Sequence, residues 1–301
     1  MSATGTTAPP AAPGGADLPE YSRTRQRQAR QGENFPIAAW LLRPGRREAR
    51  SAIYGFCRLV DDLGDEGLGD PEAQLERARS ELAACYGGHP EHPVFRRLQP
   101  VIGRFQLEPG PFTRLIEANL QDQRVSRYRD WAELDHYCTL SATPVGELVL
   151  ALEGIRDRER VSYSDSICTG LQLANMWQDL APDRERGRRY LPLEVLEQHQ
   201  AREQDYWDGH ATPELLAAQA HAVGRARHLL LAGWPLVSRV PGLMRVEMAT
   251  FILCGLAAAQ AALDAGESVL RRRASLPRAK RRQAILRAAR AWRQPRPPDP
   301  G

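Results

Sequence analysis

The sequence predicts an all-α fold, and three observations carry that prediction. Apolar residues recur at the spacing of three or four that places them on one face of a helix. Alternating strand-like runs are missing, and proline or glycine falls where helices would begin or end. With 301 residues, of which 42% are hydrophobic and 26% charged, the chain can bury a full core. No internal repeat or linker composition divides it, so a single-domain helical bundle is the simplest architecture.

The helices are expected, in chain order, near 46–64, 71–86, 93–106, 111–124, 130–140, 144–154, 164–181, 192–199, 213–238, 242–270 and 276–292. Pro71, Pro111 and Pro213 suit the first turn of three of them, where a proline costs no hydrogen-bond donor. We expect residues 1–20, rich in Ala, Pro and Gly, and residues 294–301, rich in proline, to be disordered tails. The domain is therefore placed at 21–293.

The cysteines and the apolar runs exclude several classes of protein. The five cysteines are scattered without a C-x-x-C pair, which argues against a disulfide scaffold or a zinc knuckle and favours a reducing cytoplasm. The first residues lack the basic start and apolar stretch of a secretory signal. The longest uncharged run, 248–263, is too short to span a bilayer, so we expect a buried helix there and a cytoplasmic protein.

The first chemically informative segment is an acidic helix face. Its polar residues recur at helical spacing and therefore point the same way: Tyr54, Arg58, Asp61 or Asp62, and Asp65. Like charges one turn apart destabilise a helix unless a cation or a basic partner lies between them. Two interpretations stay open for this segment alone, namely a metal site or a solvated acidic helix end that Arg58 partly neutralises.

The second segment repeats this pattern on an otherwise uncharged helix, with polar residues again at helical spacing: Gln172, Asn175, Asp179 and Asp183. Buried carboxylates need a cation, although a structural polar network is the alternative. Two facing acidic stripes supply the hard oxygen ligands that suit Mg²⁺, which keeps several waters and shares its remaining positions with phosphate oxygens.

These motifs resemble those of the squalene and phytoene synthase family of class I isoprenoid synthases. The similarity runs from about Asn34 to the basic C-terminal helix, and it includes Gly187 to Pro192 after the second motif. Segments 33–36, 61–66 and 177–179 resemble the hydroxysqualene synthases of bacterial hopanoid pathways more than the phytoene synthases. The resemblance implies a helical bundle with a central active-site cavity.

The resemblance also implies roles for individual residues. Two or three Mg²⁺ ions would be held by four carboxylates: Asp61, Asp65, Asp179 and Asp183. Residues near the reacting atoms would be Tyr137, Tyr54 and Arg58. Contacts to the substrate would come from Phe35, Asp62, Ala142, Val145, Gly146, Gln172, Asn175, Arg188 and Tyr190.

The subgroup implies a Mg²⁺-dependent conversion of presqualene diphosphate and water to hydroxysqualene and diphosphate. No NADPH is expected, because water and not hydride ends that reaction, and functional coupling to a presqualene diphosphate synthase is implied. Two alternatives remain: an enzyme that condenses two prenyl diphosphates head to head, and a non-catalytic prenyl-lipid-binding or assembly factor. Gln178 and the Asn34-Phe35-Pro36 start argue against the first, and the four retained aspartates argue against the second.

Two residues of the second motif depart from the family pattern. Gln178 stands where many members have arginine, and Pro182 where many have an acidic residue. Inside a helix Pro182 removes the hydrogen bond to the Gln178 carbonyl, so the helix should kink or end there. The arginines that follow crowd one loop, and the sequence does not show which points inward: Arg184, Arg186, Arg188 and Arg189.

The C-terminal segment 271–293 has ten basic side chains and no acidic one, whereas the rest of the chain is net acidic. Three interpretations stay open. The segment could cover the active site, with Arg272 and Arg273 near the diphosphate, lie on an anionic membrane surface, or form a solvated face. No nucleic-acid partner is expected, because no binding motif accompanies the charge.

Overall fold

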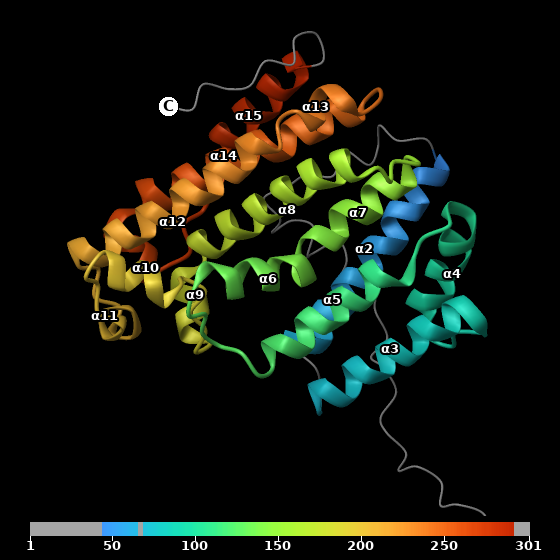
Figure 1. The fold of residues 1–301 in the computed structure, drawn as a ribbon, viewed down its shortest axis with the longest axis horizontal. Helices are drawn as coiled ribbons and strands as arrows, with labels where there is room; N and C mark the ends of the chain where they lie inside the picture. The colour runs from blue at the N-terminus through green and yellow to red at the C-terminus, as the bar shows by residue number, and fades with distance from the viewer. Residues whose placement is uncertain (1–43, 66–68, 292–301) are drawn as a thin grey trace, which may run out of the picture.

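The computed structural model describes residues 44–65 and 69–291. Within these ranges the chain is helical and forms no β-strand, and its one extended pairing is an isolated bridge between Arg127 and Arg189. The all-α prediction is confirmed (Figure 1). Phe35 and the two tails predicted at 1–20 and 294–301 lie outside the described residues, so those predictions and the domain limits stand as made.

The first half of the described chain forms one side of the bundle. Its helices are α2 (Pro44–Asp65), α3 (Pro71–Gly87), α4 (Pro93–Phe105), α5 (Pro109–Asp122), α6 (Trp131–Ser141) and α7 (Thr143–Leu152). Prolines occupy the first turn of several of them, and Asp70 and Asp130 cap two N-termini by accepting backbone N–H bonds. Phe56 of α2 packs edge-to-face on Phe95 and Phe112, which ties α2 to α4 and α5.

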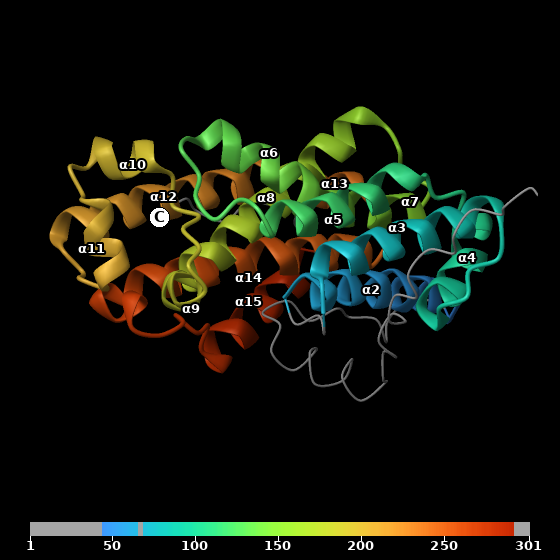
Figure 2. The same cartoon turned by 90° about the horizontal axis from the view of Figure 1, so that it is seen from below.

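The second half surrounds a long central helix. Its helices are α8 (Arg158–Gln178), α9 (Leu180–Glu185), α10 (Leu193–Gln198), α11 (Glu203–Asp208), α12 (Pro213–Ala232), α13 (Leu236–Arg239), α14 (Met244–Asp264), the 3₁₀ helix η2 (Gly266–Leu270) and α15 (Arg278–Ala291). Figure 1 shows α8 in the middle, between α7 on one side and α12 and α14 on the other. Figure 2 shows α10 and α11 at one end of the molecule and α4 at the other. The centre of the bundle is thus reached by side chains of α8.

Several helix boundaries differ from those predicted. The helix expected at 213–238 ends at Ala232, and the turn through Gly233 and Pro235 separates it from α13. The helix expected at 242–270 ends at Asp264 and continues as η2. The six-residue helices α9 and α11 were not predicted, since a segment that short shows too little periodicity to reveal itself.

The apolar run in α14 is a buried helix, as predicted. By length and composition alone α14 could cross a membrane, but 61% of its most apolar window is buried inside the protein. The basic helix α15 packs against α14 and buries Ala284 and Ala288, while most of its arginines are exposed. Helix α15 therefore packs its apolar face against the bundle and exposes its charged face.

Candidate active site

An acidic cavity of about 290 Å³ lies between α2, α5, α6 and the junction of α8 with α9. It brings together most of the residues that the sequence singled out. The predicted residues that line it are Arg58, Asp61, Asp65, Tyr137, Gln172, Asn175, Asp179, Asp183, Arg188 and Tyr190. Residues from the two acidic motifs, far apart in sequence, therefore face one space.

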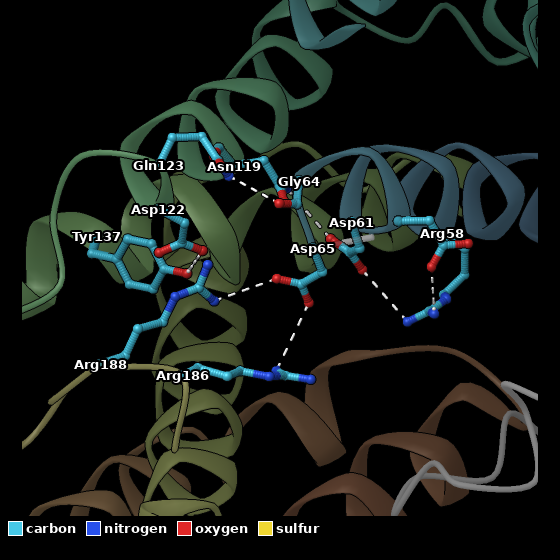
Figure 3. A network of polar contacts seen from close by, with 11 residues as sticks. Arg58, Asp61, Gly64, Asp65, Asn119, Asp122, Gln123, Tyr137, Arg186 and Arg188 are labelled. Carbon is cyan, nitrogen blue, oxygen red and sulfur yellow. Dashed lines mark hydrogen bonds and ion pairs between the residues drawn. The ribbon is translucent and has the colours of Figure 1, made fainter. Parts of the chain in front are cut away.

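The first wall is a continuous helix. Asp61 and Asp65 lie one turn apart on α2, and Gly64 between them lets α2 approach α5 closely. A Cβ at Gly64 would lie 2.5 Å from the side-chain oxygen of Asn119. Asn119 Nδ2 donates to Asp61 Oδ1 at 3.4 Å, and Gln123 Nε2 donates to the Gly64 carbonyl at 3.1 Å (Figure 3). The amides of α5 thus fix the acidic end of α2.

The second wall lies at a helix break. Helix α8 ends at Gln178, and α9 starts at Leu180 with Pro182 in its first turn. Pro182 has no N–H to donate to the Gln178 carbonyl, which instead accepts from the backbone N–H of Ala274 at 2.9 Å. The Gln178 side chain is fully buried and donates to the Ala274 carbonyl at 2.5 Å. The predicted break is confirmed, and a distant segment satisfies the groups that it leaves open.

This contact brings the start of the basic C-terminal segment to the cavity. Arg273, next to Ala274, places its Nε 2.7 Å from Asp179 Oδ1. Asp183 stays on the same wall, since its backbone N–H donates to the Asp179 carbonyl at 2.9 Å. Of the two arginines predicted near the diphosphate, Arg272 and Arg273, the structure thus places Arg273 against a carboxylate of the second motif.

The structure also shows which arginines of the loop after α9 point inward. Arg186 and Arg188 line the cavity, and both reach across to Asp65, at 4.0 Å and 3.4 Å respectively (Figure 3). Arg189 points away from the cavity and is buried, where it pairs with Glu203 at 3.2 Å and donates to the Leu191 carbonyl. Two cations from the second half of the chain therefore face the first wall.

One carboxylate of the cavity was missed by the sequence analysis. Asp122, at the end of α5, accepts a hydrogen bond of 2.7 Å from the Tyr137 hydroxyl, and its Oδ1 is buried with no hydrogen-bond partner among the described residues. Burial raises the pKa of Asp122 to about 6, although Tyr137 and Arg188 act against that shift. Asn119 and Asp122, three residues apart, form a short polar stripe that could have revealed it.

Burial disfavours the charged form of several carboxyl groups in the cavity. Enclosure raises the pKa of Asp61 to about 6, against the opposing charge of Arg58. Burial and the neighbouring Asp179 raise the pKa of Asp183 to about 7, and burial also raises that of Asp179. Burial and the charge of Asp122 raise the pKa of Tyr137 well above its usual value, so its hydroxyl remains a donor. The cavity therefore has acidic groups in excess of the cations that balance them.

These residues fit Mg²⁺ better than a metal that needs a cage made of protein alone. In the described ranges no three acidic, histidine or cysteine side chains converge closely enough to hold one ion by themselves. Mg²⁺ does not require this, because it binds one or two carboxylates and completes its shell with waters and phosphate oxygens. Paired carboxylates on two walls, with the unpartnered Asp122 oxygen in the same cavity, would suit Mg²⁺ together with a diphosphate.

A second cavity, of about 270 Å³ and mostly apolar, continues along the same helices. It is lined by the predicted residues Tyr54, Val145 and Gly146, so Tyr54 belongs to the apolar cavity and not to the acidic one. Gly146 is one of the predicted substrate contacts. The structure gives a packing reason for glycine here, because a Cβ at Gly146 would overlap the side chains of Ser164 and Cys168 on α8.

Two predicted substrate contacts do not line either cavity in the described part of the chain. Asp62 accepts from Arg58 at 2.8 Å beside the acidic cavity. Ala142 is buried at the junction of α6 and α7. Both sit next to lining residues, so their predicted roles would require a substrate to reach past the present walls.

Solved structures place this fold in a known class of helical enzymes. The crystal structure of squalene synthase HpnC from Alicyclobacillus acidocaldarius matches with a TM-score of 0.75 at 38% identity, over 81% of this chain and 93% of that one. The crystal structure of a dehydrosqualene synthase in complex with ligand matches with a TM-score of 0.73 at 21% identity, over 89% of this chain and 94% of that one, which shows the same fold.

Sequence comparison then gives the family. The profile described as Squalene/phytoene synthase matches residues 28–280, and the chain belongs to this family. The hydroxysqualene synthase of Rhodopseudomonas palustris is 32% identical over 220 residues, which are 73% of this chain and 75% of that one. The chloroplastic phytoene synthase 3 of Zea mays is 33% identical over 207 residues, which are 65% of this chain and 48% of that one. The family prediction is confirmed. Because the hydroxysqualene synthase and the phytoene synthase are similar to this chain at nearly the same identity, the comparison does not show which product this chain forms.

Proposed function

We propose that this protein is a Mg²⁺-dependent hydroxysqualene synthase that converts presqualene diphosphate and water to hydroxysqualene and diphosphate. The observation that carries the proposal is the pair of adjoining cavities. One is acidic and bordered by arginines, and the other is apolar and follows the same helices α2 and α8. A diphosphate with long prenyl chains needs both environments next to each other.

The acidic cavity would bind the diphosphate end. Asp61 and Asp65 on one wall, with Asp179 and Asp183 on the other, would hold two or three Mg²⁺ ions, which supply positive charge to the departing diphosphate. Arg186 and Arg188, now beside Asp65, are within reach of the same oxygens, and charge-assisted hydrogen bonds to an oxyanion are among the strongest available. Tyr137 and Tyr190 also line this cavity with hydroxyl groups, of which that of Tyr137 donates to Asp122.

The apolar cavity would protect the cation that remains when the carbon–oxygen bond breaks. Its walls are mostly hydrocarbon, so bulk water is kept from the cation until the rearrangement is complete. Capture by one water then forms the new carbon–oxygen bond and releases a proton. No hydride donor enters this balance, so we propose that the protein needs no NADPH.

The environment of Gln178 favours this reaction over condensation of two diphosphates. Its side chain is fully buried and bonded to Ala274, so the position that carries arginine in many relatives presents no positive charge to the cavity. That arrangement suits one bound diphosphate better than two. A condensing synthase is the second candidate, because phytoene synthases are similar at the same level of identity. If the protein is a hydroxysqualene synthase, another enzyme must supply presqualene diphosphate. We therefore propose that the protein is functionally coupled to a presqualene diphosphate synthase.

A product assay tests the proposal. The purified protein is incubated with Mg²⁺ and without NADPH, separately on presqualene diphosphate and on farnesyl diphosphate. We expect an alcohol from presqualene diphosphate alone, and an assay with Mg²⁺ removed by chelation should form none. Accumulation of presqualene diphosphate from farnesyl diphosphate would instead identify a condensing synthase.

A further inference from the structure

A buried ion pair lies in the otherwise apolar cavity. Arg50 of α2 donates through Nη1 to Glu247 of α14, and their side chains are only 6% and 8% exposed. They are the only charged side chains among the described residues that line this cavity. The pair is also incompletely bonded, because Arg50 Nε and Nη2 are buried with no hydrogen-bond partner in the described part of the chain.

The pair occupies the end of the cavity farthest from the carboxylates. On α2 the lining begins at Arg50 and proceeds through Tyr54 and Cys57 to the acidic cavity. On α8 it begins at Ser164 and reaches the acidic cavity beyond Leu171. Both helices therefore run from the ion pair toward the metal-binding end.

The Arg50–Glu247 pair lies far from the acidic cavity, where the reacting atoms would be. Arg50 precedes Asp61 by about three helical turns, or roughly 16 Å along the axis of α2. Helical side chains also lean toward the N-terminus, which directs Arg50 farther from the acidic end. What Arg50 and Glu247 can meet is thus the distal end of a hydrocarbon chain.

The charges of Arg50 and Glu247 make this end of the apolar cavity unfavourable for a prenyl chain. A buried ion pair often contributes no more to stability than apolar residues of similar size, so stability alone does not explain its presence. A chain long enough to reach this end would have to displace the buried pair, and separating two buried charges without supplying new partners is strongly unfavourable. Rejection of a competing ligand by groups that it would leave unpaired is a common source of specificity.

We propose that the Arg50–Glu247 pair closes the apolar cavity and sets the prenyl chain length that the enzyme accepts. It favours substrates built from farnesyl units over substrates that are one isoprene unit longer in each chain. The inference rests on the proposed function only in requiring a prenyl diphosphate at this site. It holds equally for a hydroxysqualene synthase and for a condensing synthase.

The test measures a ratio of specificities. We compare kcat/KM for presqualene diphosphate with kcat/KM for its analogue built from two geranylgeranyl units, in the wild type and in the double variant Arg50→Ala/Glu247→Ala. Both charges are removed together, because removing one would leave the other buried and unpaired. We expect relative activity on the longer substrate to rise about tenfold, the scale on which a hydrophobic pocket discriminates chain length.

A second variant and a matched control keep the test decisive. Arg50→Met/Glu247→Met removes the charges but keeps the volume with flexible apolar side chains, so it should fold and shift the ratio in the same direction by a smaller factor. The control, Arg114→Met/Glu147→Met, removes an ion pair of 2.6 Å between α5 and α7 that lines neither cavity, and should leave the ratio unchanged. An unchanged ratio in the folded Arg50/Glu247 variants overturns the inference.

Wild-type activity separates this inference from the proposed function. Failure of the wild type to form alcohol from presqualene diphosphate overturns the proposed reaction alone, provided that it condenses farnesyl diphosphate. The ratio is then measured between farnesyl and geranylgeranyl diphosphate, with the same expected shift. A wild type inactive on all four substrates overturns both.

Discussion

The two acidic walls of the cavity are built in different ways. Asp61 and Asp65 lie on an unbroken helix, α2, where helical spacing alone puts them on one face. Asp179 and Asp183 lie across a break between α8 and α9, where regular helical geometry stops. A segment about a hundred residues away, at Ala274, takes over the hydrogen bonds of that break.

The comparison shows that similar sequence spacing can depend on local geometry in one place and on tertiary contact in another. The first wall needs only that α2 remain helical and that α5 approach it at Gly64. The second wall also needs the C-terminal segment to dock, and docking delivers Arg273 to Asp179. We therefore expect the second wall to be more sensitive to remote substitutions.

The largest effect is expected when a carboxylate is removed from either wall. Asp61→Asn and Asp179→Asn should each lower kcat/KM by about 10²–10³-fold, because both walls contribute to stabilising the leaving diphosphate. Diphosphate release with Mg²⁺ measures this. The control is Asp208→Asn on α11, an exposed aspartate bonded to Gln204 and remote from the cavity lining. Activity retained within tenfold in either wall variant would contradict a shared role for the two walls.

Loss of the contact at the helix break should affect the second wall specifically. Gln178→Leu leaves the buried Ala274 carbonyl without its side-chain donor, and we expect the free energy of unfolding to fall by about 2 kcal/mol. The KM for substrate should also rise, because the segment that carries Arg273 loses one of its two hydrogen bonds to the break. Chemical denaturation and steady-state kinetics measure the two effects.

The matched variant on the first wall is Gln123→Leu, which removes a donor of 3.1 Å to the Gly64 carbonyl at a half-buried position. Water can replace that donor, so the loss should be below about 1 kcal/mol. Equal destabilisation by the two variants would remove the distinction between the walls.

A smaller difference is expected for two glycines that permit close helix packing. A Cβ at Gly170 of α8 would lie 3.0 Å from backbone atoms of α12, whereas one at Gly64 would meet the tip of the Asn119 side chain. Overpacking costs about 1–3 kcal/mol, and alanine regains about 1 kcal/mol in a helix. We therefore expect Gly170→Ala to destabilise by about 1 kcal/mol and Gly64→Ala to be nearly neutral, as thermal unfolding would show. Equal changes in unfolding temperature for the two variants would mean that the Asn119 side chain on α5 cannot move aside more easily than the backbone of α12.

The smallest effect concerns pH. The pKa values of Asp61 and Asp183, about 6 and about 7, lie above the value of 3.8 for an unperturbed aspartate. The folded state therefore binds more protons than the unfolded state in this window, so the metal-free protein should lose stability as pH rises from about 4 to about 7. Mg²⁺ requires the ionised carboxylates, so its stabilising effect should grow over the same range. Thermal unfolding with and without Mg²⁺ measures both trends, and a metal-free protein that gains stability on raising the pH would contradict them.

The sequence by itself determined the helical class, the family and most lining residues of the acidic cavity. Periodicity places Asp61 beside Asp65, and the motif after the second stripe points to Arg188 and Tyr190. The missing N–H of Pro182 also predicted a break near that residue, although α8 ends at Gln178 and not at 181 as expected. These predictions succeeded because each depends on neighbours within one or two helical turns.

Only the tertiary structure decided how distant side chains meet. It brought Asp122 into the site, chose Arg186 and Arg188 over Arg189 to face it, and placed Arg273 on Asp179. It also joined Arg50 to Glu247 at the far end of the apolar cavity. No local sequence pattern predicts these contacts. Each depends on the packing of helices that are remote in the chain, and the whole core determines that packing.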